Sequence, residues 1–369
     1  QDGPSGVGGA ADLARLIAAR RTAVVPRHGA FARLSIEDLA APVIAACLAD
    51  AGLAPDRVDE VILSNALGAG GNPARRVALA AGLPLQVAGL SIDRQCAGGL
   101  DAILLARALV DSGAAEVVLA GGVESFSRRP VRLATDPDGG PSVAYDQAPF
   151  TPWPDRDPPM AEAAEALADR LGINRARQEV WSVESHAKAL KSNHSTEIVP
   201  LLGVTRDAFA RRLTPALLAR APVVAGSVTA ATAAVAADAA AACVVVSDRV
   251  AQGRGLAILA GATVGGNPVE PGLAPLAAIA RVWGGEPLAQ AEIMEAYAVQ
   301  AIAVVEGAGI NPALVNPGGG ALARGHPIGA SGAILAVRLF HGLKAGRGLA
   351  AVASAGGIGT ALLVKASGP

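Results

Sequence analysis

One cysteine lies where the sequence could make it reactive. Cys96 lies in the segment DRQCAGGLDA, between a short strand expected over residues 90–94 and an apolar helix expected over 97–110. A thiol at the start of a helix lies near the positive end of the helix dipole, which lowers its pKa and raises its thiolate fraction. The glycines that follow leave room for a substrate to approach. The alternative, an inert core cysteine, is the usual reading of an isolated cysteine in an apolar chain.

His326 is the histidine whose setting suits acid–base chemistry. It lies in GHPIGASGA, residues 325–333, ahead of a second apolar helix. Imidazole can accept and donate a proton near neutral pH. The other histidines fall in no comparable motif, and we expect structural or surface roles for His28, His186, His194 and His341. Cys47 and Cys243 are expected to be core residues.

The elements that must position these side chains alternate between helix and strand. Ser35 and Gly52 are the expected N-cap and end of a helix over residues 35–51. Further strands are expected over 58–64, 116–120, 242–246 and 255–260, and further helices around 161–171, 175–192 and 295–307.

The segment that follows Cys96 resembles the segment that follows His326, because each has a glycine turn, a buried helix, a small-residue strand and a Gly-Gly end. Two halves about a pseudo-twofold axis would place both residues at equivalent helix starts.

The composition excludes several functional classes. The chain has 369 residues, 51% of them hydrophobic, with 44 glycines, 3% aromatic residues and a net charge of −1. Neither a basic excess nor a stacking surface is present, so we expect no nucleic-acid partner. The most apolar stretch, residues 223–247, is mainly alanine and carries Asp238, which argues against a membrane partner. Three scattered cysteines fit a reducing compartment, and with no secretory pattern at the start we expect a cytoplasmic protein. No residues show metal-ligand spacing, so no metal is expected.

From about residue 20 to residue 365, the chain resembles the thiolase family. The resemblance rests on motifs in the family's order: GGNPARR at 70–76, DRQCAGGLDA at 93–102, GGVESFS at 121–127, MAEAAE at 160–165, GSVTA at 226–230 and GHPIGASGA at 325–333. It implies an α/β fold of two pseudo-symmetric βαβαβαββ halves, each with a mixed five-stranded sheet, in a layered α/β/α/β/α core. An inserted loop domain would cover coenzyme A. The expected division is 10–125 with 215–250 for the N-terminal half, 126–214 for the insertion and 251–369 for the C-terminal half.

The resemblance also implies roles for particular residues. Cys96 would carry the acyl group, and His326 would activate it and hold the thioester oxygen of the second substrate. The backbone N–H groups of Cys96 and Ala355, in a return that includes Gly356, would form an oxyanion hole. Coenzyme A thioesters would be substrates, and no permanently bound cofactor is expected. A homodimer or homotetramer is implied, and a hetero-oligomer is also possible.

The chain departs from the family pattern at three positions. The family carries a second cysteine, the base of the second half-reaction, where this chain has Ala353. It carries the asparagine of an N-E-A-F segment, which holds a catalytic water, where this chain has Met294 in MEAY. A serine that contacts coenzyme A is replaced by Ala234. The acylation half of the site is therefore kept and the carbanion half is altered, and loss of a general base costs about 10²–10⁴ in rate.

Two further residues have open interpretations. Met160 either lines the acyl or pantetheine pocket or packs in the core, and Glu295 either orients backbone or His326 or is purely structural. The sequence predicts a coenzyme A-dependent acyltransferase that carries out Claisen condensation or thiolytic cleavage of a 3-ketoacyl-CoA. One alternative is acyl transfer to a pre-activated or decarboxylating acceptor, or to an amine or hydroxyl. The other is a thiolase-fold subunit that supports an active partner.

Overall fold

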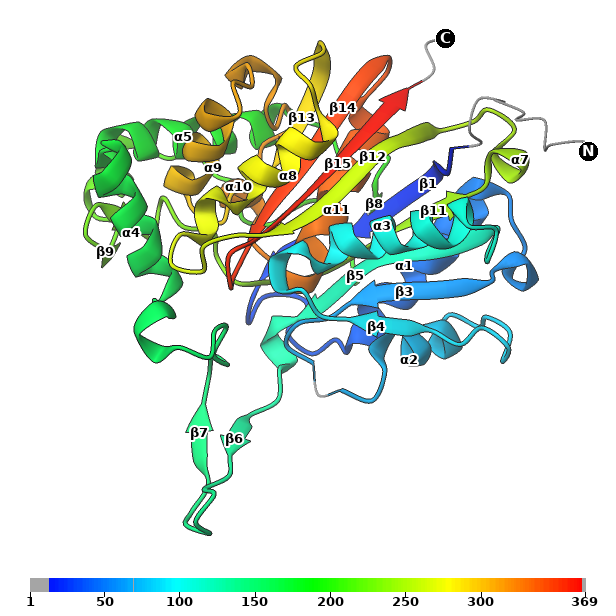
Figure 1. Cartoon of the computed structure of the whole chain (residues 1–369), viewed down its shortest axis with the longest axis horizontal. Coiled ribbons are helices and arrows are strands. Elements are labelled where there is room, and N and C mark those ends of the chain that lie inside the picture. The colour runs from blue at the N-terminus through cyan, green and yellow to red at the C-terminus, as the bar shows by residue number, and fades with distance from the viewer. Residues whose placement is uncertain (1–12, 69, 367–369) are drawn as a thin grey trace, which may run out of the picture.

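Two half-sheets with the same strand order are joined edge to edge. Within residues 13–68 and 70–366, which the computed structural model describes, they make one eleven-stranded sheet (Figure 1). The first half runs, from its outer edge inward, through β4 (Leu90–Ile92), β3 (Glu60–Ser64), β5 (Val117–Ser125), β11 (Ala237–Val246) and β1 (Arg15–Thr22). The second half runs inward through β13 (Leu288–Ile293), β14 (Gly346–Ser354), β15 (Ile358–Ala366) and β12 (Leu256–Gly265). The halves meet where β1 and β12 pair antiparallel over two residue pairs.

The pairing directions repeat as well. In the first half β3 is parallel to β4 and β5, β5 is antiparallel to β11, and β11 is antiparallel to β1. In the second half β13 is parallel to β14, β14 is antiparallel to β15, and β15 is antiparallel to β12. Ala291 of β13 also forms an isolated parallel bridge to Val315, where the first half has β4. The expected five-stranded repeat is thus reduced to four strands and one bridge in the second half.

Helices form three layers around this sheet. On the outer face of the first half lie α1 (Ile36–Ala51) and α2 (Pro73–Ala80), and on that of the second half α8 (Ala274–Val282) and α9 (Ala298–Gly307). Between the halves, α3 (Gly98–Asp111) and α11 (Ile328–Gly342) pack against each other and against strands of both halves (Figure 1). This confirms the expected layered α/β fold. The shorter helices are η1 (Pro55–Arg57), η2 (Gln95–Ala97), η3 (Phe126–Arg128), η4 (Pro154–Arg156), η5 (Pro271–Leu273), η6 (Pro312–Leu314), α6 (Pro215–Ala219), α7 (Asp248–Ala251) and α10 (Ala321–Arg324).

The two central helices approach closely because glycines lie at their crossing. A Cβ atom on Gly99 would lie 2.6 Å from the backbone nitrogen of Ala333, and one on Gly332 would lie 2.5 Å from that of Leu100. The contact is reciprocal, as expected near a pseudo-twofold axis. Because real Cβ atoms do not approach other atoms this closely, only glycine lets the helix starts meet at this distance. This crossing brings together the two chain segments that carry Cys96 and His326.

The insertion contains a projecting hairpin and a helical part. Strands β6 (Arg132–Ala134) and β7 (Val143–Tyr145) pair antiparallel and extend away from the sheet (Figure 1). Helix α4 (Met160–Leu171) packs against α9, as does α5 (Arg175–Lys191). The other short strands are β2 (Val25–Pro26), β8 (Ile198–Val199), β9 (Val223–Ala225) and β10 (Val228–Thr229). The division at 126 and 214 stays a prediction, and its ends at 10–12 and 367–369 lie outside the described residues.

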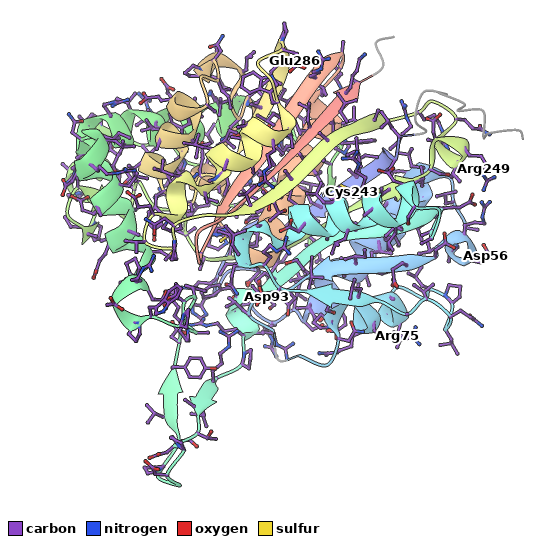
Figure 2. All side chains as sticks on the ribbon, in the orientation of Figure 1. Asp56, Arg75, Asp93, Cys243, Arg249 and Glu286 are labelled. Carbon is purple, nitrogen blue, oxygen red and sulfur yellow. The ribbon has the colours of Figure 1, made fainter. Side chains whose placement is uncertain are left out.

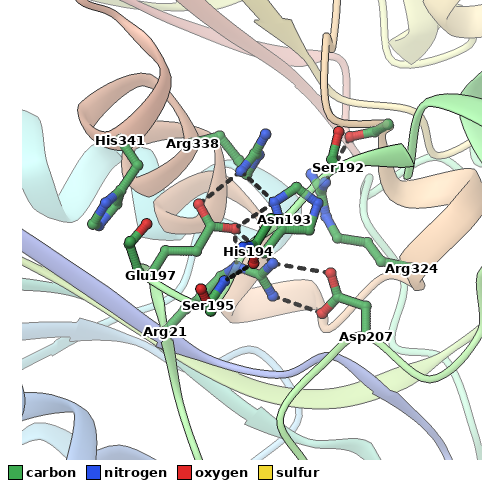
Figure 3. Close-up of polar contacts among 12 residues, drawn as sticks. Arg21, Ser192, Asn193, His194, Ser195, Glu197, Asp207, Arg324, Arg338 and His341 are labelled. Carbon is green, nitrogen blue, oxygen red and sulfur yellow. Dashed lines mark hydrogen bonds and ion pairs between the residues drawn. The ribbon is translucent and has the colours of Figure 1, made fainter. Parts of the chain in front are cut away.

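A buried ion cluster ties the insertion to both halves. Arg21 of β1, fully buried, pairs with Glu197 at 2.7 Å and with Asp207 at 2.7 Å. The other Glu197 oxygen accepts from Arg338 of α11 at 2.7 Å, and His194 lies beside this pair (Figure 3). The guanidiniums hold the pKa of Glu197 and that of Asp207 down at about 2, despite burial. The segment that returns from α5 to the sheet is therefore anchored by charge in the interior.

Most expected elements are present, with shifted ends. Helix α1 begins after Ser35, whose side chain forms a capping box with Asp38, and it ends at Gly52 with φ 67°. Strands β11 and β12 are longer than the expected 242–246 and 255–260. The additional residues of β11 are alanines and an aspartate, which carry little strand propensity and pair because neighbouring strands are in place. Those of β12 include Thr263 and Val264, which favour a strand.

Candidate active site

Cys96 and His326 meet at the central helix crossing. The Cys96 Sγ atom lies 3.1 Å from His326 Nε2. Cys96 lies in η2, directly before α3, and the residue before it, Gln95, has a φ of 48°. The carboxylate of Asp93 accepts the Gln95 backbone N–H at 2.8 Å and holds this left-handed turn. On the other side, the His326 backbone N–H donates to Val235 at 2.7 Å. Two segments 230 residues apart thus present a thiol and an imidazole to each other.

Burial keeps both groups neutral in the resting site. It raises the pKa of the Cys96 thiol to about 12, although the backbone N–H groups of Cys96 and Ala355 act in the opposite direction. The negative charges of Glu124 and Asp93 raise the pKa of this thiol further. Burial also lowers the pKa of His326 to about 4. The expectation that the helix start would lower the thiol pKa is therefore wrong, because desolvation of the thiolate outweighs the favourable backbone dipoles.

Ser331 determines which His326 nitrogen can act as a base. Its hydroxyl oxygen lies 2.6 Å from His326 Nδ1 and donates to the Pro327 carbonyl at 3.1 Å. When this hydroxyl donates to the carbonyl, it accepts from Nδ1–H. Nε2 is then left with a lone pair directed at the thiol. Sequence analysis did not single out Ser331. Its position five residues after the histidine, in the same glycine-rich motif, is the signal that could have found it.

Backbone N–H groups reach the sulfur from two sides. The N–H of Cys96 itself and that of Ala355 both interact with the thiol, and each acts to lower its pKa. Ala355 follows β14, and the next residue, Gly356, takes a φ of 79° in the turn before β15. The neighbouring Ser354 hydroxyl donates to the Arg94 carbonyl at 2.9 Å, which links this turn to the segment before Cys96.

A buried carboxylate holds the backbone segments next to the reacting pair. Glu124, 1% exposed, accepts backbone N–H groups from Ala66, Leu67 and Gly329 at 2.9–3.1 Å. It also accepts from the Asn65 amide at 2.9 Å. Burial raises the pKa of Glu124 to about 7. Its bond to Gly329 positions the first turn of α11. The family resemblance covered this residue in GGVESFS, but it had no assigned role.

A cavity of about 270 Å³ opens onto the pair. Three of the expected substrate-binding residues line it, namely Met160, Ala234 and Ala353. Met294 does not, because its side chain is 1% exposed in the core cluster that also contains Ala97 and Ala321. The structure therefore places Met294 in the core. Residues that line the cavity and that sequence analysis gave no role include Phe126, Arg129, Phe150, Leu167, Tyr297 and Gln300.

Glu295 is fully engaged away from the reacting pair. Its two oxygens accept from the Trp181 indole at 3.0 Å, the Ser185 hydroxyl at 2.8 Å, the Asn316 amide at 2.9 Å and the Leu322 backbone N–H at 3.2 Å. It forms no hydrogen bond with His326 within the described residues. Of the interpretations left open for Glu295, the contacts fit the one in which it orients backbone and joins α5 to α10.

Other reactive side chains lie elsewhere. Cys47 and Cys243 are fully buried, and burial raises the pKa of each thiol. Cys243 lies on β11, and Arg75 lies on α2, where its guanidinium donates to the Val87 carbonyl (Figure 2).

In the part of the chain that the structure describes, no group of three or more His, Cys, Asp or Glu residues could hold a metal ion. Over the same residues, no helix is both long and apolar enough to cross a membrane.

Comparison with known proteins identifies the family. The model for the thiolase N-terminal domain matches residues 14–249, and that for the thiolase C-terminal domain matches 255–366. The acetyl-CoA acetyltransferase of Cupriavidus necator is 37% identical, over 95% of this chain and 98% of that protein. The crystal structure of the Bacillus anthracis acetyl-CoA acetyltransferase superposes with a TM-score of 0.90 at 32% identity, covering 96% of this chain and 99% of that one. A structure of the Ascaris suum Acat5 thiolase in complex with coenzyme A gives 0.88 at 28% identity, covering 96% and 100%.

Two family models together span nearly the whole chain, and this chain covers 98% of the Cupriavidus necator protein, in agreement with the fold. The chain belongs to the thiolase family. It is an enzyme of the acyltransferase class.

Proposed function

We propose that this enzyme moves an acyl group from a coenzyme A thioester to Cys96 and then to an acceptor. The observation that carries the proposal is the 3.1 Å contact between Cys96 Sγ and His326 Nε2, both of which line a cavity of about 270 Å³. The similarity to acetyl-CoA acetyltransferases, and to a thiolase solved with coenzyme A, supports a coenzyme A thioester as the donor. Coenzyme A enters as a substrate, and no resident cofactor is required.

The first half-reaction follows from the neutral pair. His326 Nε2 accepts the thiol proton as Cys96 Sγ attacks the thioester carbonyl carbon. The carbonyl oxygen gains negative charge, and the backbone N–H groups of Cys96 and Ala355 stabilise it. When the tetrahedral intermediate collapses, its bond to the coenzyme A sulfur breaks, and that sulfur takes the proton from His326. The products are an acyl-Cys96 thioester and free coenzyme A.

The second half-reaction defines the activity class. We favour Claisen condensation, or its reverse, thiolytic cleavage of a 3-ketoacyl-CoA, because relatives that this chain covers to 98–99% of their length are named acetyl-CoA acetyltransferases. Ala353 lines the cavity but offers no base. His326 Nε2, free once coenzyme A leaves, would then remove the α-proton. Ala353 equally motivates the alternative of a decarboxylating or pre-activated acceptor, an amine or a hydroxyl.

The proposed assembly rests on the family resemblance, and the proposed location rests on the three scattered cysteines. We propose a homodimer or homotetramer in the cytoplasm, acting on acyl-CoA without a nucleic-acid or membrane partner. A hetero-oligomer in which this chain supports an active partner is the second candidate, motivated by Ala353 and Met294. The N-terminal half, the insertion and the C-terminal half keep the boundaries given above.

Intact-protein mass spectrometry tests the first half-reaction. After incubation with a panel of acyl-CoA thioesters, we expect a mass gain of one acyl group on the wild type. Cys96→Ala should abolish it, whereas Cys47→Ala, a buried control, should keep it. An undiminished gain in Cys96→Ala would sink the proposal.

Size-exclusion chromatography and turnover assays of the purified chain alone test the hetero-oligomer. Full turnover without a partner removes that candidate. Acyl-enzyme formation without turnover, restored by a partner, would favour it.

A further inference from the structure

A carboxylate close to the nucleophile in sequence is buried although it takes no part in the chemistry described above. Asp101 lies in the first turn of α3, five residues after Cys96, and is 3% exposed. It is not among the residues that line the cavity, so contact with a substrate there does not explain its burial. Burying a carboxylate costs free energy unless donors and cations surround it. Its role therefore lies in its contacts within the protein.

Three side chains donate to this carboxylate, and two of them belong to the second half-sheet. The Thr263 hydroxyl of β12 donates to Asp101 Oδ1, and the Thr360 hydroxyl of β15 donates to the two carboxylate oxygens at 3.2 and 3.3 Å. The Arg94 guanidinium lies 3.2 Å from Oδ1. Burial raises the pKa of Asp101, whereas these three partners act in the opposite direction. The carboxylate thus ties the start of α3, an element of the first half, to two strands of the second.

Arg94 attaches the other side of the nucleophile to the same half-sheet. It lies two residues before Cys96, and its carbonyl accepts the Ser354 hydroxyl at 2.9 Å. Ser354 is the last residue of β14 and directly precedes Ala355, whose N–H interacts with the Cys96 sulfur. The segment that carries the nucleophile is therefore fixed to the second half-sheet at both ends. The ion pair between Arg94 and Asp101 also joins these two ends to each other.

We propose that Asp101 is a positioning residue for acylation, which holds Cys96 in place relative to the Ala355 N–H. The proposal rests on the proposed function, because the oxyanion forms only when Cys96 attacks a thioester. The two N–H groups that stabilise this oxyanion come from different halves of the molecule. Their alignment depends on how the nucleophile segment sits on the second half-sheet, and a displacement of about 1 Å costs about 100-fold in rate.

Asp101→Asn removes the charge and keeps the shape of the side chain. The burst of coenzyme A release from acetyl-CoA gives the maximal rate of acylation and the concentration of acetyl-CoA at half-maximal rate. We expect the rate to fall by about 10- to 100-fold and the half-saturating concentration to stay within about twofold, because Asp101 does not contact the substrate. Asp111→Asn is the matched control. It breaks an ion pair with Arg107 at the far end of the same helix and should change neither quantity.

Exchanges at Thr263 test the same contact from the second half-sheet. Thr263→Val keeps a β-branched side chain, which suits a strand, but removes the hydroxyl that donates to Asp101. It should slow acylation in the same way as Asp101→Asn. Thr263→Ser retains the donor and should acylate at the wild-type rate. Equal acylation rates in Thr263→Val and Thr263→Ser would overturn the proposal.

Alkylation separates the positioning role from a general loss of structure. When iodoacetamide reacts with Cys96, an S–C bond forms, iodide leaves and the thiol proton passes to His326, so no oxyanion arises. Peptide mass spectrometry follows this reaction at Cys96. We expect the alkylation rate of Asp101→Asn to stay within about threefold of wild type, since only acylation needs the oxyanion donors.

These measurements distinguish the two levels of the argument. A wild type that forms no acyl-enzyme would overturn the proposed function itself. A wild-type acylation rate in Asp101→Asn, or a parallel loss of acylation and alkylation, would overturn the positioning role alone.

Discussion

The resting Cys96–His326 pair should be a neutral thiol and a neutral imidazole. With a thiol pKa of about 12, the thiolate fraction at pH ~7.5 is ~3 × 10⁻⁵, compared with ~0.1 for an ordinary thiol of pKa ~8.5. The population of free thiolate is therefore about three thousand times smaller than usual. Catalysis must instead move the proton to His326 Nε2 during the attack, across the 3.1 Å contact. Acylation is then independent of pH above about 4, where the imidazole of His326 becomes protonated.

Ultraviolet difference titration measures the thiolate directly. A thiolate absorbs more strongly in the ultraviolet than a thiol, so the spectrum of the wild type minus that of Cys96→Ser reports this sulfur alone. We expect no step between pH 5 and 9. Acylation in D₂O should be about two- to threefold slower, because a proton is in flight. A thiolate step near neutral pH, present in the wild type and lost in Cys96→Ser, together with no solvent isotope effect, would refute the neutral pair.

Three further predictions concern the surroundings of the pair. Ser331→Ala should slow acylation by about tenfold with little change in unfolding free energy, because the imidazole loses the acceptor that selects its tautomer; an unchanged burst of coenzyme A release would contradict this. Gly332→Ala places a Cβ atom 2.5 Å from the Leu100 nitrogen, so urea denaturation should show a loss of about 1–3 kcal/mol, and an unaltered midpoint would argue against the close crossing. Glu197→Gln leaves two buried guanidiniums without their shared carboxylate, and calorimetry should register a loss of about 3–5 kcal/mol; a wild-type melting temperature would count against the buried cluster.

What could be predicted from the sequence was local or carried by motifs. The ends of α1 followed from Ser35 and Gly52, because a cap depends on a few adjacent residues. The repeated halves followed from the similarity of the segments after Cys96 and His326. The repeat led us to expect that Cys96 and His326 meet, and the structure places Cys96 Sγ 3.1 Å from His326 Nε2.

What could not be predicted depends on burial and on long-range contacts. The predicted direction of the Cys96 pKa shift was wrong. The helix start that favours the thiolate is visible in the sequence, whereas the desolvation that disfavours it is a property of the folded site. Met294, which the family resemblance led us to expect in place of a water-binding side chain, packs inward among core residues. Tyr297 was visible as the last residue of MEAY, but only the structure shows that it lines the same cavity as Cys96.

The narrow junction between the half-sheets makes the chain a candidate for protein complementation. Only two residue pairs join β1 to β12, whereas the central helices interlock through glycines from both halves. A cut in the turn at residues 252–255 would give one fragment with the nucleophile and another with the base. Neither fragment could carry out acylation alone, so activity would report their association. The same crossing that aligns the two reacting atoms would thus serve as the recognition surface of a split enzyme.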